Sequence, residues 1–449
     1  MSKNWVRLVT VLLPLLAVLS YHFEKEVKEA YFDFSNSIHL QWENYSSSHK
    51  QLPTVLKPEI DESPLMIVED TWSLNLFKTH AKRKGFQLLE INNKTPPKSI
   101  PDFRVLWLKV YPFQRPDLKQ LILQVTQRAK IGSKILVNHF PGNGYFTSKL
   151  YMLGWAPEWY FPKGYFLGSQ WDAFVTKFKE EEESLKNVPK DKFYANMPQW
   201  VMKGEHRDIE FIHSIEQVEA ATKERGKKYF MAQRFINNPL LVDNKKFDIG
   251  IYVLWTSVDP VKVFLFDEIL LRFCPEEYGL ERTSQYVIAE KYTYPWDMPS
   301  LKDSYEEKPY SQKHALSNWL TALNRPECAY ETLWDGINMI IRDVFDKSSK
   351  YMSEQTNNFI VNNQIDAINF FEMVRFDFLV DDDCKVFMLE ANMSPNLHPG
   401  NLRQKSLFDN VIHKVLKKVN EEFDLNNELK FEDAHKGDFE DFGEFVPLQ

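Results

Sequence analysis

Hydrophobic and polar positions alternate along this chain with the periods of short strands and amphipathic helices. Apolar runs at residues 86–91, 103–111 and 134–138 are typical of strands. Residues 70–78 and 117–131 instead repeat their apolar positions roughly every three to four residues, which predicts helices. Strands that alternate with helices in this way indicate an α/β layered fold.

The second half of the chain predicts longer strands arranged as hairpins. Residues 246–255 and 262–273 are expected to pair antiparallel across an Asp-Pro turn. Residues 376–380 and 386–390 are expected to form a second hairpin. The remaining expected elements are strands at residues 200–203 and 229–236 and helices at residues 172–186, 312–323 and 330–347.

The N-terminal segment differs in kind from the rest of the chain. Lys3 and Arg7 precede an apolar run that is shorter than the about 20 residues of a full membrane span. No clear cleavage site follows, so residues 1–23 predict an uncleaved signal anchor and a single-pass membrane protein. Lys25 and Lys28 lie beyond the run, which leaves open whether the body of the chain is cytosolic or lumenal.

Composition narrows the classes of function. Of the 449 residues, 43% are hydrophobic and 14% are aromatic, which is ample for a folded core and excludes a disordered chain. The formal net charge of −8 argues against a general nucleic-acid binder, because such a protein needs a dominant basic face. Cys274, Cys328 and Cys384 are far apart and odd in number, so they predict free thiols rather than a metal pair or a disulfide framework.

Three oxygen-bearing side chains on the second hairpin are candidate metal ligands. Glu390 and Asn392 are two residues apart and share one face of a strand, and Asp377 can lie opposite on the neighbouring strand. Mg²⁺ takes a few such oxygens and keeps positions for water and phosphate. Alternatively, the two acids simply face solvent. The apolar neighbours Phe376 and Met388 favour the metal, because buried carboxylates that lack a cation are costly.

Basic side chains at strand ends are candidate phosphate ligands. Lys203 ends one expected strand and Lys246 begins another, so both could neutralise phosphates as point charges. A single lysine is more often a surface charge, and these two positions stay open on this reasoning. Arg272 lies inside an apolar strand, where it has to meet a buried anion or reach a cleft.

Five motifs, in sequence order, resemble those of the tubulin–tyrosine ligase-like family, and in particular its glutamylases. They are Asn-His-Phe-Pro-Gly at residues 138–142, the run that begins Gln-Arg-Phe-Ile at 233–243, Lys-Phe-Asp-Ile at 246–249, Leu-Arg-Phe at 271–273, and the hairpin 376–395 with Phe-Asp-Phe-Leu and Leu-Glu-Ala-Asn-Met-Ser-Pro. The resemblance implies an ATP-grasp-type fold with ATP between a central and a C-terminal domain. It also implies a reaction in which ATP phosphorylates a carboxylate and an amino group displaces the phosphate.

The resemblance implies roles around the metal and the phosphates. Asp377, Glu390 and Asn392 match the magnesium ligands. Lys203 matches the lysine on the nucleotide phosphates, and Arg272 matches the arginine near the γ-phosphate and the acyl-phosphate. Phosphoryl transfer is catalysed by positioning and by cations around the developing charge, which suits these residue types.

A second group of matched residues surrounds the nucleotide itself. Gln233, Phe235 and Ile236 fall where the resemblance implies that adenine is held. Lys246 and Asp248 would line the nucleotide, and Lys246 is also a candidate catalytic residue. The expected cofactors are therefore ATP and Mg²⁺.

The resemblance and the composition together divide the chain into six expected parts. A polar stretch follows the anchor, and the C-terminal stretch is acidic with spaced phenylalanines, which is typical of a flexible tail or docking segment. The parts are an anchor at residues 1–23, a linker at 24–61, an N-terminal α/β domain at 62–138, a central ATP-grasp domain at 139–233, a C-terminal ATP-grasp domain at 234–425 and an acidic tail at 426–449.

Two departures from the family pattern keep several functions open. Family members usually read Lys-Phe-Asp-Leu-Arg, whereas Gly250 takes the arginine position here. The segment after Lys203 has a single glycine and two acids, which hinders the approach of backbone amides to phosphates. The first hypothesis is a ligase that adds glutamate to a protein such as tubulin in microtubules. The alternatives are a binding protein without turnover and a ligase for a small-molecule carboxylate.

Overall fold

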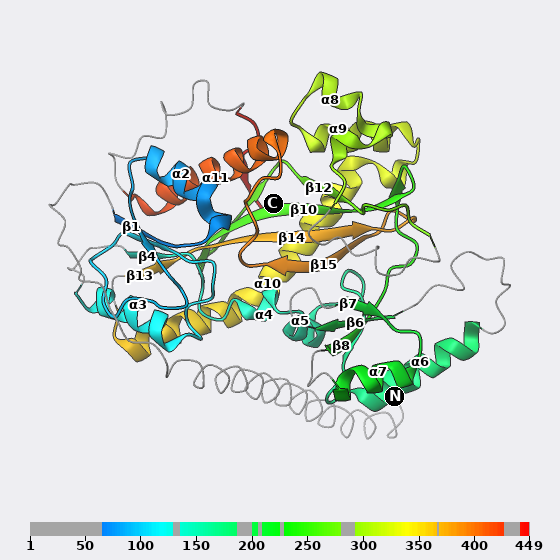
Figure 1. Cartoon of the computed structure of the whole chain (residues 1–449), viewed down its shortest axis with the longest axis horizontal. Coiled ribbons are helices and arrows are strands. Elements are labelled where there is room, and N and C mark those ends of the chain that lie inside the picture. Colours follow the sequence, from blue (N-terminus) through cyan, green and yellow to red (C-terminus); the bar gives the residue numbers. More distant parts are fainter. Residues whose placement is uncertain are drawn as a thin grey trace, which may run out of the picture.

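The computed structural model describes residues 65–128, 135–185, 200–204, 209–224, 229–279, 292–365, 368–425 and 441–448. Within these residues the strands form three sheets with helices packed against them (Figure 1). The expected mixed α/β class is therefore confirmed.

A five-stranded parallel sheet lies at the left of the molecule in Figure 1. Its strands, in spatial order, are β13 (Ile368–Phe370), β4 (Ile135–Val137), β3 (Val105–Trp107), β1 (Leu65–Glu69) and β2 (Gln87–Ile91). Helices α2 (Asn75–Arg83) and α3 (Pro116–Arg128) pack against opposite faces of it. Cover on both faces explains why the inner strands β1, β3 and β4 read as apolar runs.

Strand β3 is shorter than its apolar run predicts, because the backbone amides after Trp107 donate hydrogen bonds to side chains. The amide of Leu108 donates to Asn138 Oδ1 over 2.8 Å, and the amide of Lys109 donates to Glu69 Oε2 over 2.8 Å. These donors are satisfied outside the strand ladder, so the strand ends there. The neighbouring helix α2 also begins later than predicted, after a 3-10 turn at Trp72–Leu74.

A seven-stranded antiparallel sheet, the central sheet, forms the middle of the molecule. Its strands are β9 (Leu241–Val242), β10 (Lys245–Val258), β11 (Val261–Phe266), β12 (Leu270–Phe273), β14 (Glu372–Val380), β15 (Val386–Asn392) and β16 (Phe445–Pro447). The long strand β10 pairs with β14 along one edge and with β11 and β12 along the other. The predicted hairpin of β14 and β15 is present.

The run predicted as one strand at residues 262–273 is two strands, because Glu268 interrupts it. Its buried carboxylate accepts hydrogen bonds from the amides of Ile269 and Lys313 and from the hydroxyl of Ser311. The chain therefore leaves β10 at this point and returns to it, so that β11 and β12 pair with different halves of the same strand.

Two long helices cover opposite faces of the central sheet. Trp255 of β10 contacts Phe345 of α10 (Tyr330–Asn363), with ring centroids 4.7 Å apart. Tyr252, on the other face, contacts Phe408 of α11 (Leu402–Phe423), with centroids 6.4 Å apart. Odd and even positions of a strand face opposite ways, so β10 is buried on both sides. α10 continues past its predicted end because buried Phe359 extends its apolar stripe, and α11 was not predicted.

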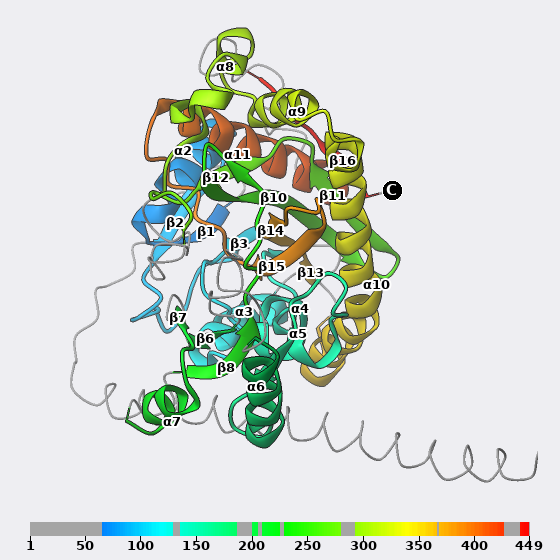
Figure 2. The same ribbon diagram turned by 90° about the vertical axis from the view of Figure 1, so that its right-hand side faces the viewer.

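A four-stranded antiparallel sheet lies on the β15 side of the central sheet in both views (Figure 1, Figure 2). Its order is β5 (Gly164–Phe166), β8 (Tyr229–Arg234), β6 (Trp200–Gly204) and β7 (Ile209–Phe211). Helices α6 (Trp171–Leu185) and α7 (Ile215–Glu224) cover one face. The predicted strands and helix in this region are confirmed. Further helices are α4 (Gly144–Thr147), α5 (Lys149–Trp155), α8 (Ser304–Glu307) and α9 (Gln312–Ala322).

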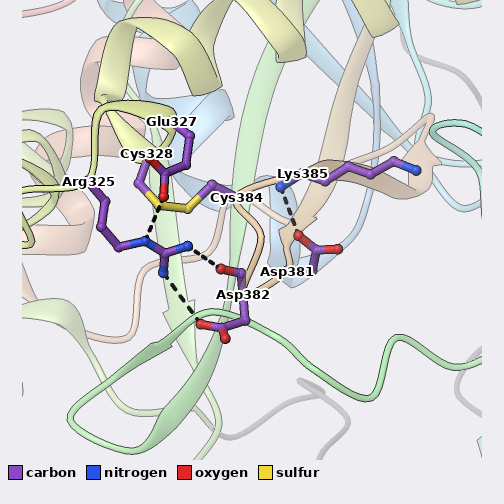
Figure 3. Close-up of a disulfide and its surroundings, with 7 residues drawn as sticks. All are labelled: Arg325, Glu327, Cys328, Asp381, Asp382, Cys384 and Lys385. Atoms are coloured by element: carbon purple, nitrogen blue, oxygen red, sulfur yellow. Dashed lines mark hydrogen bonds and ion pairs between the residues drawn. A yellow bond between two sulfur atoms is a disulfide. The ribbon is translucent and has the colours of Figure 1, made fainter.

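A disulfide between Cys328 and Cys384 ties the start of α10 to the turn of the β14–β15 hairpin (Figure 3). The prediction of free thiols is therefore wrong for this pair, and it holds for the buried Cys274. Arg325 supports the same junction, because its guanidinium donates to the backbone oxygen of Asp382 over 2.6 Å. Sequence spacing could not reveal the pair, since 56 residues separate the cysteines and the fold alone brings them together.

The predictions for the two ends of the chain require corrections. The anchor predicted at residues 1–23 and the linker at 24–61 lie outside the described residues. In the part of the chain that the structure describes, no helix is both long and apolar enough to cross a membrane, which contradicts the predicted single-pass membrane localisation. The predicted membrane partner is not confirmed. The predicted flexible tail is described from residue 441, where β16 pairs with β11 and Phe445 is buried.

Candidate nucleotide and metal site

Polar side chains gather on one stretch of the otherwise apolar central sheet, and we call them the polar patch. Strand register aligns them: Asp248 pairs with Arg272, and Asp377 pairs with Glu390. Residues two apart on a strand share a face, which adds the remaining members. The polar patch consists of Lys246, Asp248, Arg272, Arg375, Asp377, Glu390 and Asn392.

Asp377 lies inside the polar patch and is only 1% exposed. Arg375 binds both of its oxygens, with Nε 2.6 Å from Oδ1 and Nη2 2.9 Å from Oδ2. Arg272 Nη2 also lies 2.9 Å from Oδ2. The burial of this carboxylate was expected to require a metal cation, but two guanidinium groups of the protein already neutralise it.

Glu390 and Asn392 lie next to Asp377, as their spacing predicts. Lys149, at the start of α5, forms an ion pair with Glu390, with Nζ 2.7 Å from Oε2. Burial alone would raise the pKa of Glu390, but Lys149, the Asn392 amide and Lys203 together outweigh burial and lower it. Asn392 Nδ2 donates to Asp377 Oδ2 over 2.9 Å and to Glu390 Oε1 over 3.0 Å, so one amide links both carboxylates.

This set of donors fits Mg²⁺. A half-turn of the Asn392 amide would bring its oxygen to the place where its nitrogen now meets both carboxylates. Among the described residues, no three His, Cys, Asp or Glu side chains cluster in a way that could hold a metal ion. A site here would therefore combine two carboxylates and one amide with water and phosphate oxygens, which is the coordination that Mg²⁺ favours.

Lys203 reaches the same region from β6 of the four-stranded sheet. Its Nζ donates to Gln233 Oε1 over 2.6 Å, and Gln233 Nε2 donates to the backbone oxygen of Pro162 over 2.9 Å. Burial, aided by nearby Lys149, lowers the pKa of Lys203 to about 7, while Glu390 opposes both effects. Side chains from the two sheets meet at this site, because Lys246 of β10 contacts the ring of Phe235, which directly follows β8.

The other predicted residues form two pairs, Lys246 with Phe235 and Arg272 with Asp248. Lys246 Nζ lies 4.9 Å from the ring centroid of Phe235, a cation–π contact, and burial lowers the pKa of Lys246. Arg272 donates two hydrogen bonds to Asp248, from Nε to Oδ1 over 2.8 Å and from Nη2 to Oδ2 over 2.7 Å. Burial raises the pKa of Asp248 to about 6, although Arg272 opposes that shift. Arg272 thus meets a buried anion, as predicted, and Ile236 is half-buried beside Phe235.

Sequence reasoning missed two cations of this site. Arg375 precedes the Phe-Asp-Phe-Leu motif by one residue and lies in a fully buried strand. The reasoning that singled out Arg272, a charge inside an apolar strand, would also have found Arg375. Lys149 carried no comparable signal, because it opens a short helix far from Glu390 in the sequence.

Comparison with known proteins identifies relatives. Residues 128–427 match the Tubulin-tyrosine ligase family. A probable tubulin polyglutamylase of Caenorhabditis elegans is 30% identical over 405 residues, which cover 88% of this chain and 71% of that protein. A probable beta-tubulin polyglutamylase of Tetrahymena thermophila is 25% identical over 315 residues, 65% of this chain and 24% of that protein. A tubulin polyglutamylase of Homo sapiens is 23% identical over 313 residues, 68% and 33% of the two chains.

These matches differ in how much of each relative they include. The chain spans most of the Caenorhabditis relative, but only a third or less of the length of the other two. The family match covers more than half of the chain and contains the whole polar patch together with Lys149 and Lys203. The predicted resemblance to the glutamylases is thereby confirmed, and this chain belongs to the tubulin-tyrosine ligase family of ligases.

Proposed function

We propose that this protein is an ATP- and Mg²⁺-dependent ligase that joins glutamate to a carboxylate side chain of tubulin. The observation that carries the proposal is the balance of charge at the site, where five cationic side chains surround three carboxylates. The cations are Lys149, Lys203, Lys246, Arg272 and Arg375, and the carboxylates are Asp248, Asp377 and Glu390. An excess of positive charge between two sheets suits a polyanionic nucleotide.

The proposed reaction has two steps. A carboxylate oxygen of the substrate bonds to the terminal phosphorus of ATP while the bond to ADP breaks, which gives an acyl phosphate. The deprotonated amine of glutamate then attacks the acyl carbon, loses its second proton and releases inorganic phosphate as the amide forms. Fixed cations near the developing charge lower such barriers. Arg272 supports this role, because Asp248 and Asp377 hold its guanidinium in one orientation.

We assign the remaining residues to the nucleotide and its metal. Bound Mg²⁺ neutralises phosphate charge and orients the phosphates. Asp377, Glu390 and Asn392 would hold this ion, and Lys203 and Lys246 would bind the phosphates. The adenine side would be formed by Gln233, Phe235 and Ile236, with Asp248 lining the nucleotide. The contact of Lys246 of the central sheet with Phe235, which follows β8 of the four-stranded sheet, supports an ATP-grasp-type arrangement, with a central domain at residues 139–233 and a C-terminal domain at 234–425.

The names of the relatives support the choice of tubulin and of glutamate. All three are called tubulin polyglutamylases, with the word probable attached to two of them. The family match at residues 128–427 includes the candidate site, where the chemistry would take place. We therefore infer that the same substrate class serves this chain.

The test is the incorporation of radiolabelled glutamate into tubulin in the presence of ATP and Mg²⁺. We expect incorporation by the native protein and a loss of about 10²–10³-fold in Glu390→Gln, which keeps the shape of the side chain but removes its charge. Glu354→Gln on the exposed part of α10 is the matched control and should leave the rate unchanged. ATP binding without incorporation above the Glu390→Gln level would instead support a binding protein, and incorporation into small acceptors alone would support a small-molecule ligase.

A further inference from the structure

The side chain of Arg375 occupies the space above Gly250. Gly250 of β10 pairs directly with Asp377 of β14, and Arg375 lies two residues before Asp377 on the same face. A Cβ atom on Gly250 would lie 3.0 Å from Arg375 Cδ and 3.4 Å from its Nε. It would also lie 3.3 Å from the Cβ of Leu270. A side chain at position 250 would press on Arg375, and its absence leaves room for the arginine of the neighbouring strand to cross over β10.

The guanidinium of Arg375 ends within the candidate site. It binds both oxygens of Asp377, beside Arg272 and Asn392, and Arg375 is only 8% exposed. Tyr252 of β10 pairs with Arg375, and the guanidinium opposes the rise in the pKa of the Tyr252 phenol that burial causes. An arginine carries five N–H donors, and the fork on Asp377 uses two of them. Arg375 can thus hold Asp377 and bind a second anion at the same time.

The excess of positive charge at the site favours the binding of a second anion. Asp377 already has the guanidinium of Arg272 at 2.9 Å, so Arg375 brings a second buried cation to one carboxylate. Burying a charge is costly unless an opposite charge and good hydrogen bonds offset the cost. With five cations and three carboxylates in the site, an anionic ligand would complete the balance.

We propose that Arg375 binds the terminal phosphate of the nucleotide, from the space that Gly250 leaves open. This proposal rests on the proposed function, because it takes the ligand to be ATP. It also explains why Gly250 can take the position where family members carry an arginine. In this chain Arg375 of β14, two residues before Asp377, supplies a cation to the site in place of an arginine on β10. A guanidinium suits this task, since its fork binds phosphate and carboxylate oxygens with fixed geometry.

The experiment compares the affinities for ATP and ADP in the presence of Mg²⁺, by calorimetry on the full chain. The native protein should bind ATP more tightly than ADP. Arg375→Met should weaken ATP binding by about tenfold or more and leave ADP binding nearly unchanged, because only ATP has the terminal phosphate. Arg375→Lys keeps the charge beside Asp377 if the methionine variant does not fold, and it should lose part of the preference. Arg342→Lys, on the exposed face of α10, is the matched control.

A double variant tests the crossing of the strands. Gly250→Arg combined with Arg375→Gly moves the arginine to β10 and removes the side chain that would collide with it. We expect this pair to restore the preference for ATP and to restore glutamate incorporation to within about tenfold of the native rate. Gly250→Arg alone should unfold at a lower temperature than the native protein, because its Cβ meets Arg375 at 3.0 Å.

The outcomes separate this proposal from the proposed function. A folded Arg375 variant with the native ratio of ATP to ADP affinity would overturn the role of Arg375, even if glutamate is incorporated. A loss of ATP preference in a protein that does not modify tubulin would support Arg375 and count against the proposed substrate. If the native protein binds neither nucleotide, both proposals are wrong. A stable double variant that shows no recovery of ATP preference would also count against Arg375, because a counter-ion for Asp377 alone would explain the single variants.

Discussion

Lys203 lies among other positive charges, and this gives nucleotide binding a dependence on pH. Burial and the neighbouring Lys149 lower its pKa to about 7. Below that pH the ammonium group is charged and attracts phosphate, and above it the charge is lost. We expect ATP affinity measured by calorimetry to fall by about tenfold, or about 1.4 kcal/mol, between pH 6 and pH 9.

The matched variant for this prediction is Lys203→Arg. An arginine stays protonated over this whole range, so its contribution to ATP binding should not change with pH. The phosphates of ATP titrate equally in both experiments, and the difference between the two pH profiles therefore isolates Lys203. Identical profiles for the two proteins would show that Lys203 does not bind the nucleotide.

Residue patterns predicted those members of the site whose reason is local. Asp377, Glu390 and Asn392 followed from the two-residue period of a hairpin, and Arg272 followed from the cost of a charge in an apolar strand. Lys149 could not be predicted, because only the packing of α5 brings it to Glu390. Their assignment to a metal and to phosphates stays a prediction until ligand binding is measured.

The β14–β15 hairpin is the element on which all three predicted metal ligands lie. Its turn is fastened to α10 by the Cys328–Cys384 disulfide and by Arg325 (Figure 3). The strands of this hairpin were predicted because their apolar runs are long and their turn is polar. The disulfide was not predicted, because the partner of Cys384 lies in another element and no local pattern identifies it.

Removal of this disulfide should destabilise the fold. We expect the double variant Cys328→Ala and Cys384→Ala to lower the free energy of unfolding by about 2–4 kcal/mol, because the unfolded chain gains the freedom that the cross-link removes. Urea denaturation, followed by circular dichroism, measures the change. Cys274→Ala is the control that removes a thiol without removing a cross-link. A reductant should shift the native protein and leave the double variant where it is, and coincident curves for native and double variant would refute the prediction.

On the scale of the whole molecule, the sheets are completed by strands that come from far along the chain. β13 follows α10 and yet pairs in parallel with β4 of the five-stranded sheet. β16 comes from the acidic C-terminal stretch and pairs with β11 at the edge of the central sheet. The alternation of apolar and polar runs predicted the mixed α/β class. It could not predict these two edge strands, because a segment of three residues acquires a strand conformation only from the sheet that it joins.

The C-terminal segment of residues 441–448 fastens α11 to the central sheet through both charge and apolar packing. Lys414 of α11 is 5% exposed in its side chain and forms ion pairs with Asp441, at 2.8 Å, and with Glu444. Phe445 packs against Phe266, with ring centroids 5.3 Å apart. Truncation after residue 440 would remove these partners and leave the ammonium of Lys414 buried without them. We expect it to lower the free energy of unfolding by about 3–5 kcal/mol.

Two variants separate the charge from the packing in this segment. Lys414→Met in the truncated chain should recover part of the lost stability, because it removes the buried charge whose partners are gone. Phe445→Ala in the full chain should cost about 3 kcal/mol, since it leaves a cavity beside Phe266. Val446→Ala, at an exposed position of the same strand, should change little. Equal urea midpoints for the full and truncated chains would mean that the C-terminal stretch behaves as the flexible tail that its composition predicts, and that β16 contributes no stability to the central sheet.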